Sequence, residues 1–264
     1  MISIAGIELE MFERGHGAPI LYLHGGAGIA TDLPFIDLLA RERRIIAPSH
    51  PGFGKSSLPD WLDSIDDIAH VYLELLDRLG LTRTDIVGFS IGGWIAAELA
   101  TKVPGWLDHL VLIGPVGVKT GRPDKLDIPD IFALPQDKLD RLRFHDPAKN
   151  AVDLTSMPDD ELHIVARNRE TLALLTWEPY MHNPKLKHRL HWVKVPTLFL
   201  RGVSDGIVSA EYLQRYAALI PGARTDTIAE AGHWPHVEQP SATAAKVLHF
   251  LQAAQAAETS GARP

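Results

Sequence analysis

The feature that most constrains the fold is an alternation of short apolar runs with longer segments of helical periodicity. Apolar runs lie at residues 20–23, 44–48 and 85–89, and each is followed by a turn rich in glycine or histidine. Between residues 64 and 80 the apolar positions recur at helical spacing instead. Strands that alternate with helices usually pair in parallel, with helices on both faces of the sheet. The sequence therefore predicts an α/β fold.

The alternation is interrupted after residue 114 and resumes near residue 190. Further strands are expected at residues 109–113, 196–200 and 224–229, and helices at residues 64–80, 91–102, 210–219 and 241–252. Ser64 and Asp67 have the spacing of a capping box at the start of the first of these helices.

The interrupting segment, residues 115–189, is rich in proline and contains amphipathic stretches at residues 137–144 and 159–175. We predict that it forms a helical cap inserted into a core made of residues 1–114 and 190–252. Residues 253–264 are small, polar and unpatterned, which predicts a flexible tail.

Composition excludes several classes of protein. The chain has 264 residues, 45% of them hydrophobic, and a net charge of −7, which gives no support for nucleic-acid binding. Because it has no cysteine, it cannot use a disulfide, a thiolate metal site or a cysteine nucleophile. We expect no membrane span, since no apolar run approaches about 18 residues. The start of the chain also lacks the pattern of a secretory signal, so we expect a cytoplasmic protein.

A serine lies between the third apolar run and an alanine-rich helical segment. Gly88-Phe89-Ser90-Ile91-Gly92 matches G-x-S-x-G, in which the serine sits on a strained turn from strand to helix. The two glycines leave room for the strand and the helix to cross. The motif predicts Ser90 as a nucleophile, although the same five residues would also suit a tight structural turn.

A serine nucleophile needs a general base and an acid that orients this base. His233 lies between the last predicted strand and the last predicted helix, with His236 as a nearby competitor. Asp205 lies just beyond the strand predicted at residues 196–200. The chain order serine, acid, histidine, with each residue at the carboxyl end of a predicted strand, indicates a catalytic triad.

With these motifs the chain resembles serine hydrolases of the α/β-hydrolase fold that carry a helical cap. The resemblance extends from about residue 3 to residue 252 and includes HGGAG (24–28), HPGFGKS (50–56) and GHWPHVEQP (232–240). It implies a mostly parallel eight-stranded sheet flanked by helices. It also implies that His233 is the base, and that His236 supports it or lines the cavity.

The same resemblance implies an oxyanion hole. One donor would be the amide of Ile91, and the other would come from the HGGAG loop, with Gly26 as the first choice, then Ala27 and then Gly25.

Candidates for the walls of the substrate pocket are large or aromatic residues near the elbow, in the cap or beside His233. They are His24, Phe89, Trp94, Trp177, Tyr180, Met181 and Trp234, with weaker claims for Phe132, Leu134 and His145.

We predict no cofactor and no metal. The stretch Gly54-Lys55-Ser56 resembles part of a phosphate-binding loop, but Ser49 stands where that loop needs a glycine. The histidines form no H-E-x-x-H pattern.

The nucleophile type narrows the chemistry. Relatives that resemble haloalkane dehalogenases and epoxide hydrolases carry aspartate at this position, so Ser90 favours hydrolysis of a small or medium ester, including an aromatic ester or a lactone. The main alternative is cleavage of a carbon–carbon bond in a ring-cleavage diketone, although such relatives usually have G-S-G-P-G where this chain has HGGAG. Haloperoxidase or perhydrolase chemistry, a ligand receptor on the same fold and a homodimer are further alternatives.

Overall fold

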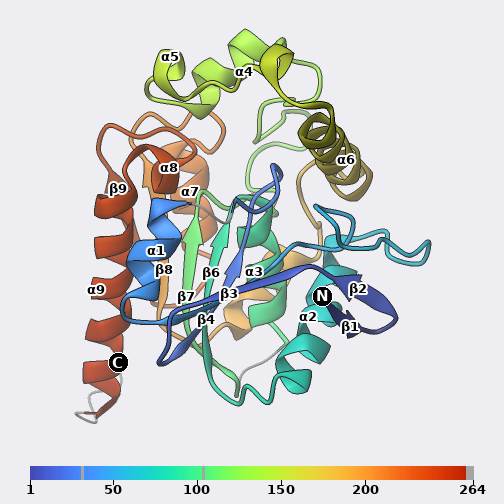
Figure 1. The fold of residues 1–264 in the computed structure, drawn as a ribbon. Helices are drawn as coiled ribbons and strands as arrows, with labels where there is room; N and C mark the ends of the chain where they lie inside the picture. The colour runs from blue at the N-terminus through green and yellow to red at the C-terminus, as the bar shows by residue number, and fades with distance from the viewer. Residues whose placement is uncertain (31–32, 103–104, 260–264) are drawn as a thin grey trace.

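A computed structural model describes residues 1–30, 33–102 and 105–259, with side chains described as far as Gln255. In these residues the central element is a seven-stranded sheet in the order β3-β5-β4-β6-β7-β8-β9 (Figure 1). β3 is antiparallel to β5, and the other neighbours pair in parallel. The predicted mostly parallel sheet is therefore confirmed.

The number of strands differs from the prediction. The sheet has seven strands rather than eight, and β1 and β2 form a separate two-stranded sheet. The strands are β1 (Ile2–Ile4), β2 (Ile7–Leu9), β3 (Met11–Arg14), β4 (Pro19–Leu23), β5 (Arg44–Pro48), β6 (Thr84–Phe89), β7 (Leu107–Ile113), β8 (Thr197–Gly202) and β9 (Arg224–Ile228). β1 and β2 are joined by Ala5 and Gly6, both with positive φ, and this tight turn pairs them with each other instead of with the large sheet.

Helices cover both faces of the sheet, and each face has its own apolar core. On one face lie α1 (Pro34–Ala40) and α9 (Pro240–Thr259), and on the other lie α2 (Ile65–Arg78), α3 (Ile91–Ala100) and α7 (Ala210–Ala217). The four-residue helix α8 (Pro235–Glu238) precedes α9.

Local sequence explains where the key helices begin. Ser64 and Asp67 form the predicted capping box at the start of α2, with the Asp67 amide donating to Ser64 Oγ at 3.2 Å. Every residue of α3 is buried, and all except Glu98 are apolar or glycine, so this helix lies between the sheet and α2. These two helices back the strand that carries Ser90.

The described segment between β7 and β8 has only helices and 3-10 turns as its named elements, joined by long loops. It contains α4 (Gln136–Arg143), α5 (Pro147–Asn150), α6 (Asp159–Thr176) and single 3-10 turns at Leu154–Ser156, Leu186–His188 and Leu190–Trp192. Figure 1 shows α4, α5 and α6 above the sheet, at the edge where β6 and β7 end. The exact bounds of a cap domain, 115–189, stay a prediction.

The end of the chain corrects one expectation. Residues 253–259, predicted as a flexible tail, continue helix α9 as far as Thr259. Four alanines between residues 253 and 257 favour this, because alanine has the highest helix propensity. The last part of the predicted tail, residues 260–264, lies outside the described residues. None of the described helices combines the length and the apolar character needed to cross a membrane.

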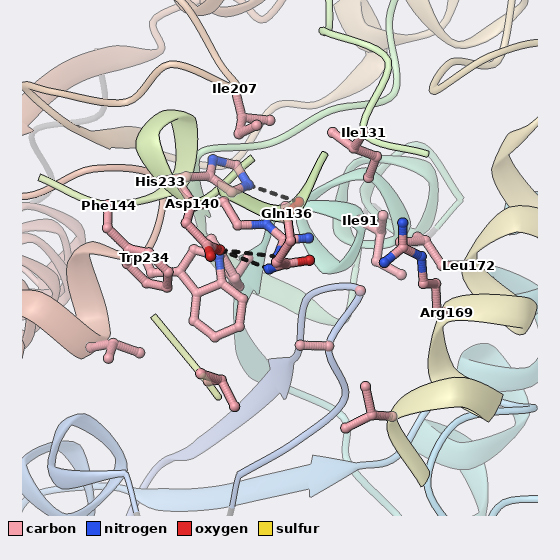
Figure 2. Close-up of a pocket in the computed structure, with 18 of the residues that line it drawn as sticks. Ile91, Ile131, Gln136, Asp140, Phe144, Arg169, Leu172, Ile207, His233 and Trp234 are labelled. Atoms are coloured by element: carbon pink, nitrogen blue, oxygen red, sulfur yellow. Dashed lines mark hydrogen bonds and ion pairs between the residues drawn. The ribbon is translucent and has the colours of Figure 1, made fainter. Parts of the chain in front are cut away.

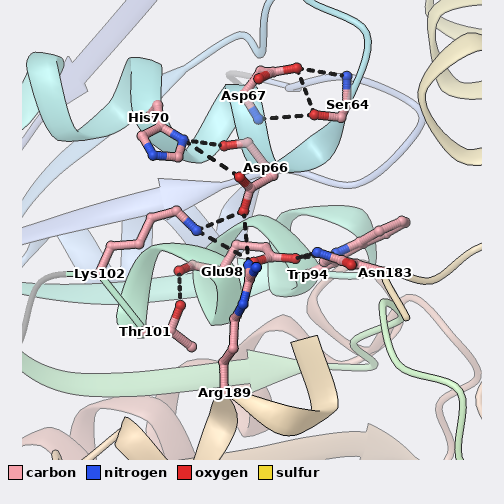
Figure 3. Close-up of polar contacts among 10 residues, drawn as sticks. All are labelled: Ser64, Asp66, Asp67, His70, Trp94, Glu98, Thr101, Lys102, Asn183 and Arg189. Carbon is pink, nitrogen blue, oxygen red and sulfur yellow. Dashed lines mark hydrogen bonds and ion pairs between the residues drawn. The ribbon is translucent and has the colours of Figure 1, made fainter. Parts of the chain in front are cut away.

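A buried carboxyl group joins α3 to α2 and to the segment before β8 (Figure 3). Glu98 is fully buried, and its Oε1 accepts hydrogen bonds from Asn183 Nδ2 at 2.6 Å and from Trp94 Nε1 at 3.4 Å. Its Oε2 lies 3.5 Å from Lys102 Nζ, which also contacts Asp66 on α2 at 2.7 Å. Burial raises the pKa of the Glu98 carboxyl, and the bond from Asn183 opposes this shift. Three elements thus depend on one buried acceptor.

We expect Glu98→Ala to lower the free energy of unfolding by about 3 kcal/mol, because it leaves buried donors without an acceptor and Lys102 without one of its partners. Glu98→Gln keeps an oxygen for Asn183 and is expected to cost about 1 kcal/mol. Urea unfolding followed by circular dichroism measures both. Equal losses of unfolding free energy in the two variants would show that the oxygen retained by glutamine does not contribute to stability.

Candidate active site

Ser90 occupies the turn between β6 and α3 in a backbone conformation that side chains seldom adopt. Its φ is 54° and its ψ is −114°. Such a conformation costs about 1–3 kcal/mol and persists only where the surroundings enforce it. The Ser90 amide donates to the Ile113 carbonyl at 2.9 Å, and its carbonyl accepts from Trp94 at 3.2 Å. The strained turn is therefore held from β7 and from the helix itself.

The flanking glycines allow the close crossing that the motif predicted. A Cβ at Gly88 would lie 2.4 Å from the Gly92 carbonyl oxygen, and a Cβ at Gly92 would lie 2.1 Å from the Leu23 carbonyl oxygen on β4. A larger residue at either position would push the helix away from the sheet. The glycines thus fix the position of Ser90 relative to β4.

The structure brings Ser90, His233 and Asp205 together. Ser90 Oγ lies 3.1 Å from His233 Nε2, and His233 Nδ1 lies 2.9 Å from Asp205 Oδ2. The second carboxylate oxygen, Oδ1, accepts the amides of Ile207 and Val208, both at 2.8 Å. Because these amides fix the carboxylate, its free oxygen is directed at the imidazole. Asp205 and His233 are both buried.

The loops that carry the acid and the histidine are tied to the end of α4. The His233 amide donates to the Arg143 carbonyl at 2.6 Å, and the Gly206 amide donates to the Leu142 carbonyl at 2.9 Å. Gly232 has no room for a side chain, since a Cβ there would lie 2.3 Å from the Arg143 carbonyl oxygen. The helical segment therefore takes part in positioning both loops.

Ser90 and His233 line a cavity of about 380 Å³ between the sheet and helices α4 and α6 (Figure 2). A volume of this size suits a small organic molecule. Most of its wall is apolar, and the larger apolar side chains are Ile91, Ile128, Ile131, Phe132, Phe144, Leu172, Met181, Ile207 and Trp234.

Several predicted residues line this cavity. Phe89, Met181 and Trp234 do so, as do Gly26 and Ala27 of the HGGAG loop. Phe132, a weaker candidate, lines it too, whereas Leu134 and His145 do not.

The predictions that His24 and Trp94 line the pocket are wrong, because both side chains lie buried behind the site. His24 Nε2 accepts the amide of His50 at 2.9 Å, and the two rings stack 3.7 Å apart. Burial lowers the pKa of His24 to about 4, so this ring is neutral at pH 7. Trp94 donates to Glu98 instead of facing the cavity.

The predictions that Trp177 and Tyr180 line the pocket are also wrong. The Trp177 side chain is 54% exposed, and the Tyr180 hydroxyl donates to the Pro129 carbonyl at 2.7 Å. These aromatic residues therefore serve the surface and the packing of the helical segment. Gly25 lies against the Phe89 ring, outside the 380 Å³ cavity.

Sequence reasoning missed the polar wall of the cavity, which comes from α4 and α6. Gln136, Asp140 and Arg143 of α4 lie across the cavity from Arg169 of α6, and Figure 2 labels all of these except Arg143. Gln136 Nε2 donates to Asp140 at 2.9 Å. An amphipathic pattern predicts charged residues on the outer face of a helix, so no local pattern indicates that these side chains line a pocket.

The described residues contain no group of three or more histidine, aspartate or glutamate side chains arranged to hold a metal ion.

Comparison with known proteins shows the family of this chain. The model of the "Alpha/beta hydrolase family" matches residues 20–246. The chain belongs to the alpha/beta hydrolase family. It is therefore a hydrolase with the α/β-hydrolase fold.

Two relatives from bacteria that carry similar sequences are both hydrolases. The 2-hydroxy-6-oxo-2,4-heptadienoate hydrolase of Pseudomonas putida strain F1 is 28% identical, with 96% of each chain covered. The 2-hydroxymuconate semialdehyde hydrolase of Pseudomonas sp. strain CF600 is 29% identical over 98% of this chain and 95% of the relative. A solved thermophilic esterase from Thermogutta terrifontis shares the fold, with a TM-score of 0.73, 24% identity and 94% of each chain covered.

The strain at Ser90 gives a test of the elbow. Ser90→Gly and Ser90→Ala both remove the hydroxyl, but only glycine adopts this φ without penalty. We expect the glycine variant to be more stable than the alanine variant by about 1 kcal/mol, after the entropy cost of glycine is subtracted. Chemical denaturation of the two proteins measures the difference. An alanine variant as stable as the glycine variant would show that the turn is not strained.

Proposed function

We propose that this hydrolase is a cofactor-independent serine esterase that cleaves small or medium carboxylic esters through an acyl-enzyme on Ser90. The observation that supports this most is the chain of hydrogen bonds from Ser90 through His233 to Asp205, which opens onto an apolar cavity. A serine paired with a histidine is suited to acyl transfer.

In the proposed first step, Ser90 Oγ attacks the ester carbonyl carbon while His233 Nε2 takes the hydroxyl proton. Their separation of 3.1 Å is within reach for this transfer. Asp205 holds the imidazole in place and stabilises the positive charge that forms on it. His233 then gives the proton to the leaving alcohol, and a water molecule releases the acyl group by the reverse sequence.

The negative oxygen of the tetrahedral intermediate needs donors beside Ser90. Ile91 is the first residue of α3, so its amide has no partner within the helix. Gly26 and Ala27 line the cavity opposite this helix end, and one of their amides would be the second donor. Gly25 is the weakest choice, because it does not line the cavity.

A second candidate is hydrolysis of a carbon–carbon bond in a ring-cleavage product that carries a carboxylate. Two relatives are named for substrates of this kind. The observation in this chain that favours it is the pair Arg143 and Arg169, which line one cavity with Asp140 as the neighbouring carboxylate, 3.9 Å from Arg143.

The charge balance of that pair favours an anionic substrate group. Burial lowers the pKa of the Arg143 guanidinium; the charge of Asp140 opposes this shift, and the positive charge of Arg169 adds to it. The guanidinium of Arg169 has no hydrogen bond and no ion pair with any residue in the described part of the chain. A carboxylate at the Arg169 side would supply the missing negative charge.

Removal of the proposed nucleophile is the direct test. We expect Ser90→Ala to keep the fold and to lose about a millionfold in kcat for p-nitrophenyl esters, since the triad acts as a unit. Stopped assays at high protein concentration, with circular dichroism as the fold control, measure this. A variant that keeps most of its activity would exclude the acyl-enzyme mechanism.

Arg169→Met separates the two candidate reactions. If the substrate is a dienoate ring-cleavage product, we expect kcat/KM to fall by about 10- to 100-fold, as for loss of a charged hydrogen bond, while neutral esters change by less than about threefold. Arg141→Met, on the outer face of α4, is the matched control. Side-by-side assays of acyl-length esters, lactones and ring-cleavage diketones show which reaction is fast. An equal effect of Arg169→Met on all substrates would argue against a carboxylate site.

A further inference from the structure

A second cavity of about 110 Å³, called here the side chamber, lies beside the HGGAG loop. Some of its walls also belong to the larger cavity: Ala27, Leu33, Phe89, Trp234 and Val237. The two spaces therefore adjoin each other. Ser90 and His233 do not line the side chamber, so a molecule there would not touch the nucleophile directly.

Two buried polar side chains line the side chamber without a hydrogen-bond partner. Tyr22 is 2% exposed and His236 is 3% exposed. Neither the Tyr22 hydroxyl nor His236 Nε2 has a hydrogen bond to any described residue, and both atoms keep some accessible surface, whereas His236 Nδ1 is fully buried and unpaired. Buried polar groups are almost always hydrogen-bonded, because an unpaired one costs about 1–3 kcal/mol. Two side chains with reachable, unpaired polar atoms in one small cavity indicate that a water molecule or a ligand group pairs with them.

The surroundings hold the His236 ring in place and keep it uncharged. Its centroid lies 4.3 Å from that of Phe89 and 6.2 Å from that of Trp234, with which it is nearly parallel. Burial, together with the nearby His233, lowers the pKa of His236 to about 3. Burial raises the pKa of Tyr22. At pH 7 the side chamber thus offers two neutral groups that can each donate and accept.

We propose that the side chamber is a subsite for the leaving alcohol of the substrate, and that Tyr22 and His236 bind a neutral hydroxyl or carboxamide at the end of that alcohol. The inference rests on the proposed ester hydrolysis. It narrows the substrate class to esters whose alcohol part is short and ends in a neutral hydrogen-bonding group.

The side of the scissile bond follows from the loop that builds the chamber. His233 Nε2 is the atom that would give its proton to the leaving oxygen, so the leaving group lies on the side of the histidine loop. Trp234, His236 and Val237 of that same loop line the side chamber. The acyl group would occupy the larger cavity, under α4 and α6.

The size and the polarity of the side chamber limit its occupant. A volume of 110 Å³ holds about three to five non-hydrogen atoms. Its remaining walls are apolar or glycine, and a charged group there would lack a counter-charge among the described lining residues. A terminal hydroxyl on a two- or three-carbon chain fits both limits.

The test compares esters of equal size. For the wild type, we expect kcat/KM for 2-hydroxyethyl butanoate to exceed that for propyl butanoate by about tenfold, as for one well-made neutral hydrogen bond. For the acyl-side pair, butyl 3-hydroxypropanoate and butyl butanoate, we expect a ratio near one. His236→Phe and Tyr22→Phe keep the ring packing and should each bring the first ratio close to one.

Tyr216→Phe is the matched control, because the Tyr216 hydroxyl is buried and unpaired but lies outside both cavities. A ratio of two substrates does not depend on the fraction of folded enzyme, so loss of stability in a variant cannot mimic the result. The proposal is overturned if the wild type shows no preference in the first pair, if both ring variants keep the preference, or if the preference appears only on the acyl side.

Binding to Ser90→Ala separates this inference from the proposed function. Calorimetric titration of that protein with the two butanoates measures the preference without turnover, and the hydroxylated ester should bind about tenfold more tightly. If this preference is present but the wild type hydrolyses neither ester, the proposed esterase function fails, and the side chamber remains only a binding site for a neutral hydroxyl. If both esters are hydrolysed at equal rates and bind equally, the subsite fails alone.

Discussion

The crossing of β6 and α3 at Ser90 is the constraint on which the rest of the site depends. The helix can lie this close to the sheet only because Gly88 and Gly92 have no side chains, and the strained φ of Ser90 is held by the bond to Ile113. Once β6 is central in a parallel sheet, the loops after its neighbours open at the same edge. Asp205 follows β8 and His233 follows β9, so the topology brings these distant residues to the edge of the sheet where Ser90 lies.

A second aspartate–histidine pair shows that residue types alone do not define such a site. Asp85 Oδ1 lies 2.6 Å from His109 Nδ1, and Asp85 Oδ2 lies 3.1 Å from Arg43. All three are buried. Asp85 lies at the start of β6 and Ser90 directly after its end, so the two are at opposite ends of this strand. The carboxylate of Asp85 therefore pairs with buried side chains far from the cavity. The end of the strand at which a residue lies therefore decides whether it can take part in the candidate site.

The sequence was sufficient for the parts of the fold that depend on local patterns. The strands from residue 20 onward, the capping box at Ser64 and the elbow each carry their signal within a few residues. The predicted number of strands was wrong because β1 and β2 pair only with each other, and tertiary packing determines this pairing. The prediction of the pocket walls was wrong for a similar reason. Trp177 faces solvent while Arg169 lines the cavity, and the proline-rich sequence around them does not show which face of a helix is covered.

The contacts of α4 and α6 imply that substrate choice and catalytic geometry are not independent here. Arg143 lines the cavity with its side chain and holds the amide of His233 with its carbonyl. On α6, Asn168 donates to the Ala27 carbonyl at 2.8 Å, so this helix also fixes the loop proposed to bind the oxyanion. A substitution that shifts either helix to fit another substrate would also move a loop of the reaction centre. Changes of specificity should therefore be tolerated best at side chains such as Ile131 and Phe132, which line the cavity from the chain before α4 and touch neither loop connection.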